Sequence, residues 1–118
     1  MAKAKKKTRT ECYYMGADLS RAVARAYAGS SAFYEGAIEV GGQQLEGAIL
    51  SLKAADFDNK LKLGKERKRL EAVAKKAGKL YKKGASTAEW QKFSSELHKV
   101  GTSISDAAVV IRKRHCND

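Results

Sequence analysis

Apolar residues recur along this chain at intervals of three and four, the spacing that places side chains on one face of an α-helix. A first helix is predicted over residues 9–28, after a capping box in which Thr8 is followed by Glu11 three positions later. Its apolar stripe is Met15, Leu19, Ala22, Val23 and Ala26. The run Gly29-Ser30-Ser31 is expected to break this helix, with a continuous or a kinked helix as the alternatives.

A second helix is predicted over residues 32–55. Its apolar positions step alternately by four and three, which is a heptad seam in which large and small residues alternate. The seam is Tyr34, Ile38, Gly41, Leu45, Ala48, Leu52 and Ala55. Each glycine of Gly41-Gly42 costs a helix interior about 1 kcal/mol relative to alanine, so the pair indicates a close approach of another helix, a kink or a break.

A third helix is predicted over residues 59–83, with Asp56 or Asp58 as its N-cap and Gly84 as its C-cap. The lysines of its last turn complement the negative end of the helix dipole. The predicted buried stripe is Leu63, Leu70, Val73, Ala77, Leu80 and Tyr81.

A fourth helix is predicted over residues 87–114, because Ser86 and Glu89 form a second capping box. It carries another heptad seam, of Trp90, Phe93, Leu97, Val100, Ile104, Ala107 and Ile111. The run Gly101-Thr102-Ser103 either bends or splits this helix.

The predicted fold class is all-α, an antiparallel bundle of about four helices with coiled-coil-like heptad seams. No segment alternates with a period of two, the chain has no proline, and helices joined by short loops must run antiparallel. We expect a single helical-bundle domain over residues 9–115, preceded by a basic flexible tail over residues 1–8. Two heptad seams in one short chain also favour self-association, so a homodimer is a further expectation.

Charge is strongly segregated along the chain. The net charge is +11, from 24 basic and 13 acidic residues. Residues 60–83 hold eleven basic and two acidic groups, a net of +9, whereas residues 11–59 hold three basic and seven acidic groups, a net of −4. The excess therefore lies in the third helix and in the N-terminal tail, and it indicates an anionic partner.

The third helix is the candidate nucleic-acid interface. A helical rod with few acids among its lysines can follow a phosphate backbone and release its counterions. The candidate nucleic-acid-binding residues are Lys62, Lys65, Lys68, Arg69, Lys75, Lys76, Lys79, Lys82 and Lys83. Lysine outnumbers arginine among them, which favours phosphate contacts with little sequence specificity over base reading.

Two other interpretations of the same charge stay open. The lysines form a solvated face, or they complement Glu35, Glu39 and Glu46 of the acidic second helix, within the fold or across a dimer. The tail residues form either a solubilising segment or an arm that wraps a partner; they are Lys3, Lys5, Lys6, Lys7 and Arg9. Of the clustered aromatic residues, Tyr13 or Tyr14 is expected to be exposed.

The alternative function is a protein-interaction module that docks its basic helix on an acidic partner surface. Such a module would be an adaptor, a subunit of a larger particle or a small inhibitor, including one encoded by a phage or mobile element. Association of the basic amphipathic helix with an anionic membrane is a third interpretation. The apolar stripe beside the lysines lacks Trp and Phe, so it is better used as core.

The cysteines and the remaining polar residues predict no catalytic or metal site. The sequence has no secretory signal and no apolar run long enough to span a membrane, so we expect a cytoplasmic, reducing context with Cys12 and Cys116 as free thiols. A disulfide, or a metal site with His115, are the alternatives for these groups. No paired-carboxylate, phosphate-loop or nucleophile-elbow motif is present. We therefore expect a protein that is not an enzyme and binds no cofactor.

Overall fold

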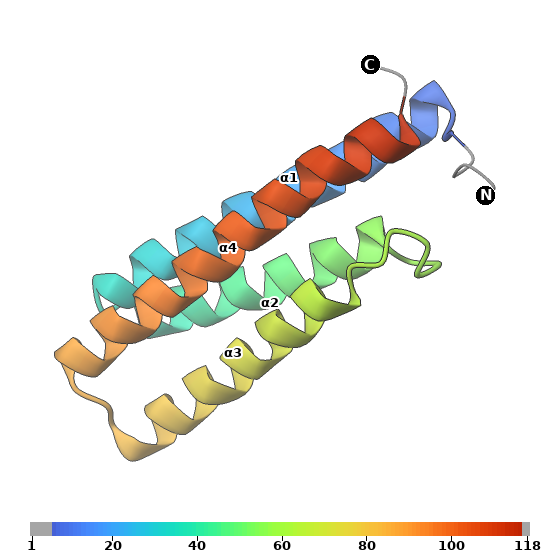
Figure 1. The fold of residues 1–118 in the computed structure, drawn as a ribbon. Helices are drawn as coiled ribbons and strands as arrows, with labels where there is room; N and C mark the ends of the chain where they lie inside the picture. The colour runs from blue at the N-terminus through green and yellow to red at the C-terminus, as the bar shows by residue number, and fades with distance from the viewer. Residues whose placement is uncertain (1–5, 117–118) are drawn as a thin grey trace.

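The computed structural model describes residues 6–116, and in it four helices run alternately up and down (Figure 1). They are α1 (Arg9–Tyr34), α2 (Ile38–Ala55), α3 (Gly64–Lys83) and α4 (Thr87–His115). Each helix packs against two others, in the ring order α1, α2, α3, α4. The predicted all-α antiparallel bundle is confirmed, with no strand in the described part of the chain.

The boundary between α1 and α2 differs from the prediction. α1 continues through Gly29 and Ser30 to Tyr34, and the turn lies at residues 35–37, where Gly36 has a φ of 86°. Ser30 is buried, and its hydroxyl donates to the carbonyl of Ser94 at 2.7 Å, so α4 holds the helix where a break was expected. Tyr34 consequently belongs to α1 and is exposed, not the first residue of the second seam.

Glycines let α2 approach α1 closely. A Cβ on Gly41 would lie 2.8 Å from the ring of Phe33, and one on Gly29 would lie 3.3 Å from the carbonyl oxygen of Gly41. Phe33 also stacks on Trp90, with ring centroids 5.3 Å apart, and meets Phe93 edge to face. Close approach of another helix therefore explains Gly41, whereas a Cβ on Gly42 would meet nothing within 4 Å.

The α4 helix is continuous through Gly101-Thr102-Ser103. A Cβ on Gly101 would lie 2.9 Å from the ring of Tyr27, so this glycine also serves close packing against α1. The core takes residues from all four helices and from the loop before α3. Its largest fully buried side chains are Phe33, Phe93, Leu19, Leu45, Leu52, Leu63, Leu70, Leu97 and Ile104.

The start of α3 was predicted too early. Residues 56–63 form a loop in which the buried carboxylate of Asp56 accepts the backbone N–H groups of Leu61 and Leu63 at 2.9 and 3.1 Å. Both leucines are buried, and Lys62 between them has a φ of 58°, outside the helical region. Asp56 thus stabilises a loop that folds back into the core and is not the N-cap of α3, which begins at Gly64.

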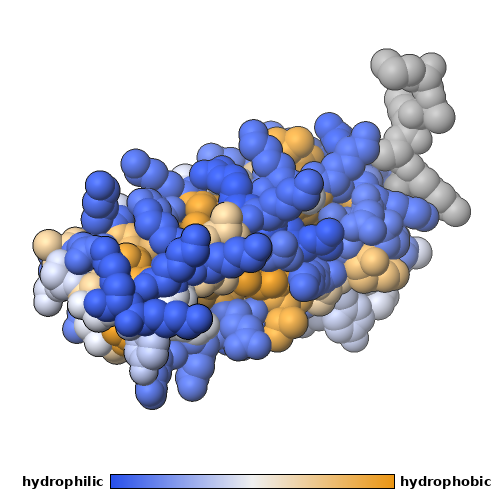
Figure 2. Space-filling model, turned by 90° about the horizontal axis from the view of Figure 1, so that it is seen from below, coloured by the Kyte–Doolittle hydropathy of each residue, from blue (hydrophilic) through white to orange (hydrophobic). Residues whose placement is uncertain are grey.

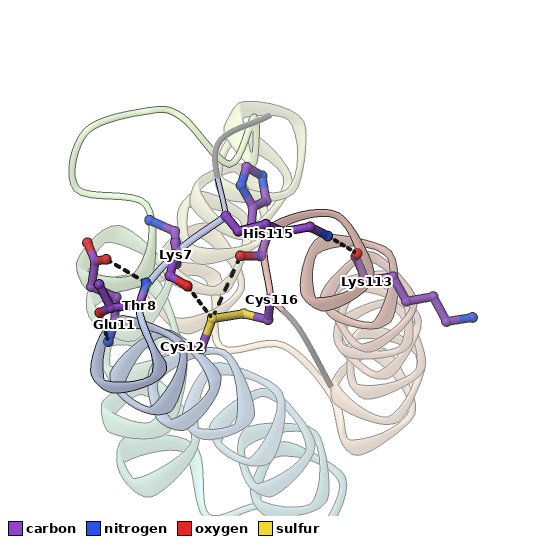
Figure 3. The surroundings of a disulfide bond; sticks show 8 residues. Lys7, Thr8, Glu11, Cys12, Lys113, His115 and Cys116 are labelled. Atoms are coloured by element: carbon purple, nitrogen blue, oxygen red, sulfur yellow. Dashed lines mark hydrogen bonds between the residues drawn. A yellow bond between two sulfur atoms is a disulfide. The ribbon is translucent and has the colours of Figure 1, made fainter. Parts of the chain in front are cut away.

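The two chain ends are joined by a disulfide between Cys12 of α1 and Cys116, the residue after α4 (Figure 3). The backbone N–H of Lys7 donates to the carbonyl of His115 at 2.7 Å, and Lys6 Nζ donates to the carbonyl of Lys113 at 3.1 Å. The Cys12 sulfur lies 3.8 Å from the His115 carbonyl oxygen. This contact is not a hydrogen bond, because the sulfur of a disulfide carries no hydrogen. The predicted capping box of Thr8 and Glu11 is present beside it.

The expectation of free thiols is therefore wrong. The up-down topology brings both ends of the chain to one end of the bundle, as Figure 1 shows, and the cysteines lie there with a Cα–Cα distance of 6.0 Å. Disulfides persist mainly in oxidising compartments. The expectation of a cytoplasmic location was based partly on free thiols, and that part of its basis no longer holds. No helix in the described residues is long and apolar enough to cross a membrane. Residues 1–5 of the tail predicted over residues 1–8 lie outside the described residues.

Replacing Gly41 and Gly42 in turn tests the close approach of α1 and α2. Gly41→Ala forces the Phe33 ring to move, and we expect it to lower the free energy of unfolding by about 1–3 kcal/mol. An added Cβ on the adjacent Gly42 meets nothing within 4 Å, so Gly42→Ala should raise it by about 0.5–1 kcal/mol. Denaturant unfolding of both variants measures the difference, and equal stabilities would contradict the contact.

Loss of the disulfide should destabilise the bundle strongly. The bond spans 104 residues, and a cross-link of about that span is expected to contribute roughly 4–5 kcal/mol through the unfolded state. The variant Cys12→Ser/Cys116→Ser should show that loss by denaturant unfolding, and the reduced native chain should match it. If reductant leaves the native protein's stability unchanged while the variant is destabilised, the loss comes from the serines and not from the cross-link.

Candidate nucleic-acid interface

The α3 helix is attached to the bundle along a narrow face. Only Leu70 and Leu80 of its residues are buried, while Val73, Ala74 and Ala77 are half-buried. Tyr81, predicted in the buried stripe, is 64% exposed. Most of the circumference of α3 is therefore solvent-facing surface, and the basic residues occupy it.

Five exposed lysines share one side of α3, and we call them the open lysine face. They are Lys65, Lys68, Lys75, Lys79 and Lys82. At roughly 100° per residue they fall within an arc of about 100°, whose centre lies about 140° around the helix from Val73, Ala77 and Leu80. Within residues 6–116 none of these five ammonium groups forms an ion pair with a carboxylate.

A second row of basic residues on α3 is engaged by α4. Lys76 Nζ lies 2.7 Å from Oε1 of Glu96, and Lys83 pairs with Glu89. Arg69 Nη1 donates to the Ser103 hydroxyl at 2.8 Å. These three predicted site residues are exposed, but their charged groups are already partnered within the fold.

The ion pair with Lys83 also affects the pKa of the Glu89 carboxyl. The bond from Lys83 and the backbone N–H of Ser86 lower the pKa of the Glu89 carboxyl below its ordinary value. Glu89 thus serves two structural purposes, because the same carboxylate closes the capping box at the start of α4.

Lys62 does not belong to either row. It was predicted on the helix, but the structure places it in the loop before α3 because Leu61 and Leu63 on both sides of it turn into the core. Of the nine predicted residues, the helix therefore brings together five as an open face and three as partners of α4.

The acidic second helix does not neutralise the third. Glu35, Glu39 and Glu46 are exposed and form no ion pair within the described residues, and the pair that joins these helices is Lys53 of α2 with Glu71 of α3, at 3.9 Å. The partners of the α3 lysines come from α4 instead, because α3 packs between α2 and α4.

A second basic cluster lies where the chain ends meet, and its residues are too far apart in the sequence to be recognised there as one site. Lys6 and Lys7 lie against the end of α4, which carries Lys113 and Arg114. The charges of Lys7, Arg114 and Lys6 all lower the pKa of the buried His115. The up-down order of the helices was the signal for this cluster. Tyr13 and Tyr14, just inside α1, are 72% and 64% exposed.

Figure 2 views the molecule from the α3 side of Figure 1 and shows hydrophilic side chains along most of this face, with strips of hydrophobic surface between them. The loop before α3 lies at the same end of the bundle as the two termini in Figure 1. Positive charge is consequently found both at this end and along the helix that starts there.

The described residues hold no group of three His, Cys, Asp or Glu side chains that could bind a metal ion. Comparison of the chain with family models, with curated proteins and with solved structures gives no match. The geometry of the surface is therefore the basis for any statement about function.

His115 predicts a specific dependence of stability on pH. Burial, followed by the nearby charges of Lys7, Arg114 and Lys6, lowers the pKa of His115 below its ordinary 6.5, and Asp58 opposes this. The unfolded chain then binds a proton more readily than the folded chain, so the free energy of unfolding is highest above pH 6.5 and falls as the pH decreases below it.

The variant His115→Gln should flatten this part of the profile, between about pH 7 and pH 5, above the range in which carboxylates titrate. Urea unfolding at a series of pH values measures the slope for both proteins. His98→Gln is the matched control, since His98 is an exposed histidine on the same helix. An equal slope for native protein and His115→Gln would contradict the assignment.

Proposed function

We propose that this protein binds nucleic acid through the phosphate backbone, with little sequence specificity and without a chemical step. The observation that carries the proposal is the open lysine face, five exposed ammonium groups on one side of α3 with no carboxylate partner in the described residues. Like charges on such a face repel one another, so an anionic partner is favoured. When the lysines neutralise phosphates of a nucleic acid, the counterions bound to the nucleic acid are released and gain entropy.

The dimensions of the face suit a backbone. Lys65 and Lys82 are 17 positions apart on α3, which corresponds to roughly 26 Å of helix. Over such a length a nucleic-acid strand presents several phosphates, at about 3.4 Å of axis per phosphate on each strand of a duplex. Lys68, Lys75 and Lys79 between the ends provide intermediate contacts.

The composition of the face supports contacts to phosphate and not to bases. All five residues are lysines, which act as point charges on flexible stems, whereas bidentate reading of guanine is typical of arginine. The arginine on the neighbouring row, Arg69, is hydrogen-bonded to Ser103. The terminal cluster of Lys6, Lys7, Lys113 and Arg114 adds charge at the end of the bundle where α3 begins.

Neighbouring lysines of α3 supply a matched test. Lys75→Gln/Lys82→Gln removes two residues of the open face, and Lys76→Gln/Lys83→Gln removes two residues that are paired with α4. Both double variants lose the same formal charge, from adjacent positions of one helix. The measurement is the affinity for a short random-sequence DNA duplex, and for the single strand, over a series of salt concentrations.

The expected result is a log–log salt slope that becomes shallower by about 1.8 for Lys75→Gln/Lys82→Gln, at roughly 0.9 per phosphate contact. The paired variant should keep a slope close to that of the native protein. Absence of binding at low salt would overturn the proposal. Equal loss of slope in both variants would show that net charge, and not the open lysine face, is responsible.

A further inference from the structure

An apolar groove runs between α2 and α3, and Phe33 of α1 and Trp90 of α4 also line it. Its volume is about 420 Å³, within the range of small-molecule sites. The lining is almost wholly apolar, and the residues that form its walls include Ile38, Leu45 and Ile49 of α2 and Ala74 and Ala77 of α3.

Two glycines keep the groove open. Gly42 on α2 and Gly78 on α3 both line it, and a Cβ added to either would meet no atom within 4 Å. Neither glycine is required by a positive φ, and neither permits a close helix contact, in contrast to Gly41. Their effect in the fold is to leave space between the larger apolar side chains of α2 and the alanines of α3.

Aromatic rings close one end of the groove. Phe33 and Trp90, stacked at 5.3 Å, both line it, and so does Tyr81 of α3, whose side chain is 64% exposed. The faces of such rings attract cations through the ring quadrupole, most strongly when the cation is removed from water.

The charged side chains that line the groove are both acidic. Glu39 and Glu46 lie two turns apart on α2, both are exposed, and no Lys or Arg is among the lining residues. Neither carboxylate forms an ion pair within the described part of the chain. In a protein with a net charge of +11, this groove combines apolar walls, aromatic rings and unpaired negative charge.

We propose that the groove binds a hydrophobic organic cation, a compact aryl or alkyl body carrying a quaternary or protonated centre. The body fills the space left by Gly42 and Gly78, and the charge lies toward Glu39 and Glu46 and the aromatic rings. This site is separate from the open lysine face, and it does not depend on the proposed binding of nucleic acid.

The native protein carries its own reporter, because Trp90 is the single tryptophan of the chain and lines the groove. Tetraphenylphosphonium and tetraphenylborate are suitable probes, since they have nearly the same size and shape and opposite charge. We expect the cation to change Trp90 emission saturably. The anion, although attracted by lysines elsewhere, should leave the emission unchanged.

Two kinds of variant locate the site. Gly42→Leu and Gly78→Leu each place a side chain in the groove from a different helix, and each should abolish the response to tetraphenylphosphonium. Glu39→Gln/Glu46→Gln should weaken binding about three- to tenfold, as expected for exposed charge pairs. Glu35→Gln/Asp106→Asn removes the same charge away from the groove lining and should bind like the native protein.

Circular dichroism of each variant confirms that the bundle is folded. The proposal is overturned if tetraphenylphosphonium produces no saturable change in the native protein, or if both leucine variants respond as the native protein does while remaining helical. A response to tetraphenylborate equal to that of the cation, insensitive to Glu39→Gln/Glu46→Gln, would overturn the assignment of charge. Nucleic-acid affinity is measured separately, so failure of either proposal is distinguishable from failure of the other.

Discussion

The close packing of α1 against α2 and α4 is the constraint on which the other features of this structure depend. Gly41 accepts the Phe33 ring against its backbone, and Gly101 accepts Tyr27 in the same way. Such contacts hold side chains at near-crystalline density, so these three helices form a unit whose shape has little freedom. α3 does not pack on α1; it contacts α2 and α4 only. It is consequently the peripheral helix, held by Leu70, Leu80 and the half-buried residues around them.

Both proposed sites follow from the peripheral position of α3. A helix that buries a narrow stripe must expose the rest of its circumference, and here the exposed part carries the open lysine face. At the edge of the same stripe, where α3 meets α2, the residues of α3 are small. The space that they leave is the apolar groove. The loop before α3 fixes its position by a different means, since the Asp56 carboxylate binds the backbone of Leu61 and Leu63 and both leucines enter the core.

The sequence predicted most of the fold and part of the candidate site. Capping boxes at Thr8 and Ser86 gave the correct starts of two helices, because their hydrogen bonds are local and need no tertiary information. The end of α1 could not be predicted, since the contacts of Gly29 and Ser30 with α2 and α4 are tertiary and leave no local signal. The disulfide and the terminal basic cluster depend on residues about a hundred positions apart, and an up-down topology permits their meeting without specifying the register of the two ends.

A count of charges along the sequence also could not tell which of two adjacent lysines pairs with a carboxylate. Lys75 and Lys76 differ by roughly 100° around the helix, and with this step Lys76 reaches Glu96 of α4 while Lys75 forms no ion pair in the described residues. Lys82 and Lys83 repeat the same division one heptad later. The run of basic residues on α3 therefore forms two sets of charges, one bonded to α4 and one exposed without a carboxylate partner in residues 6–116. The buried Leu70 and Leu80 set the rotation of α3 about its axis, and that rotation presents the second set on a single face.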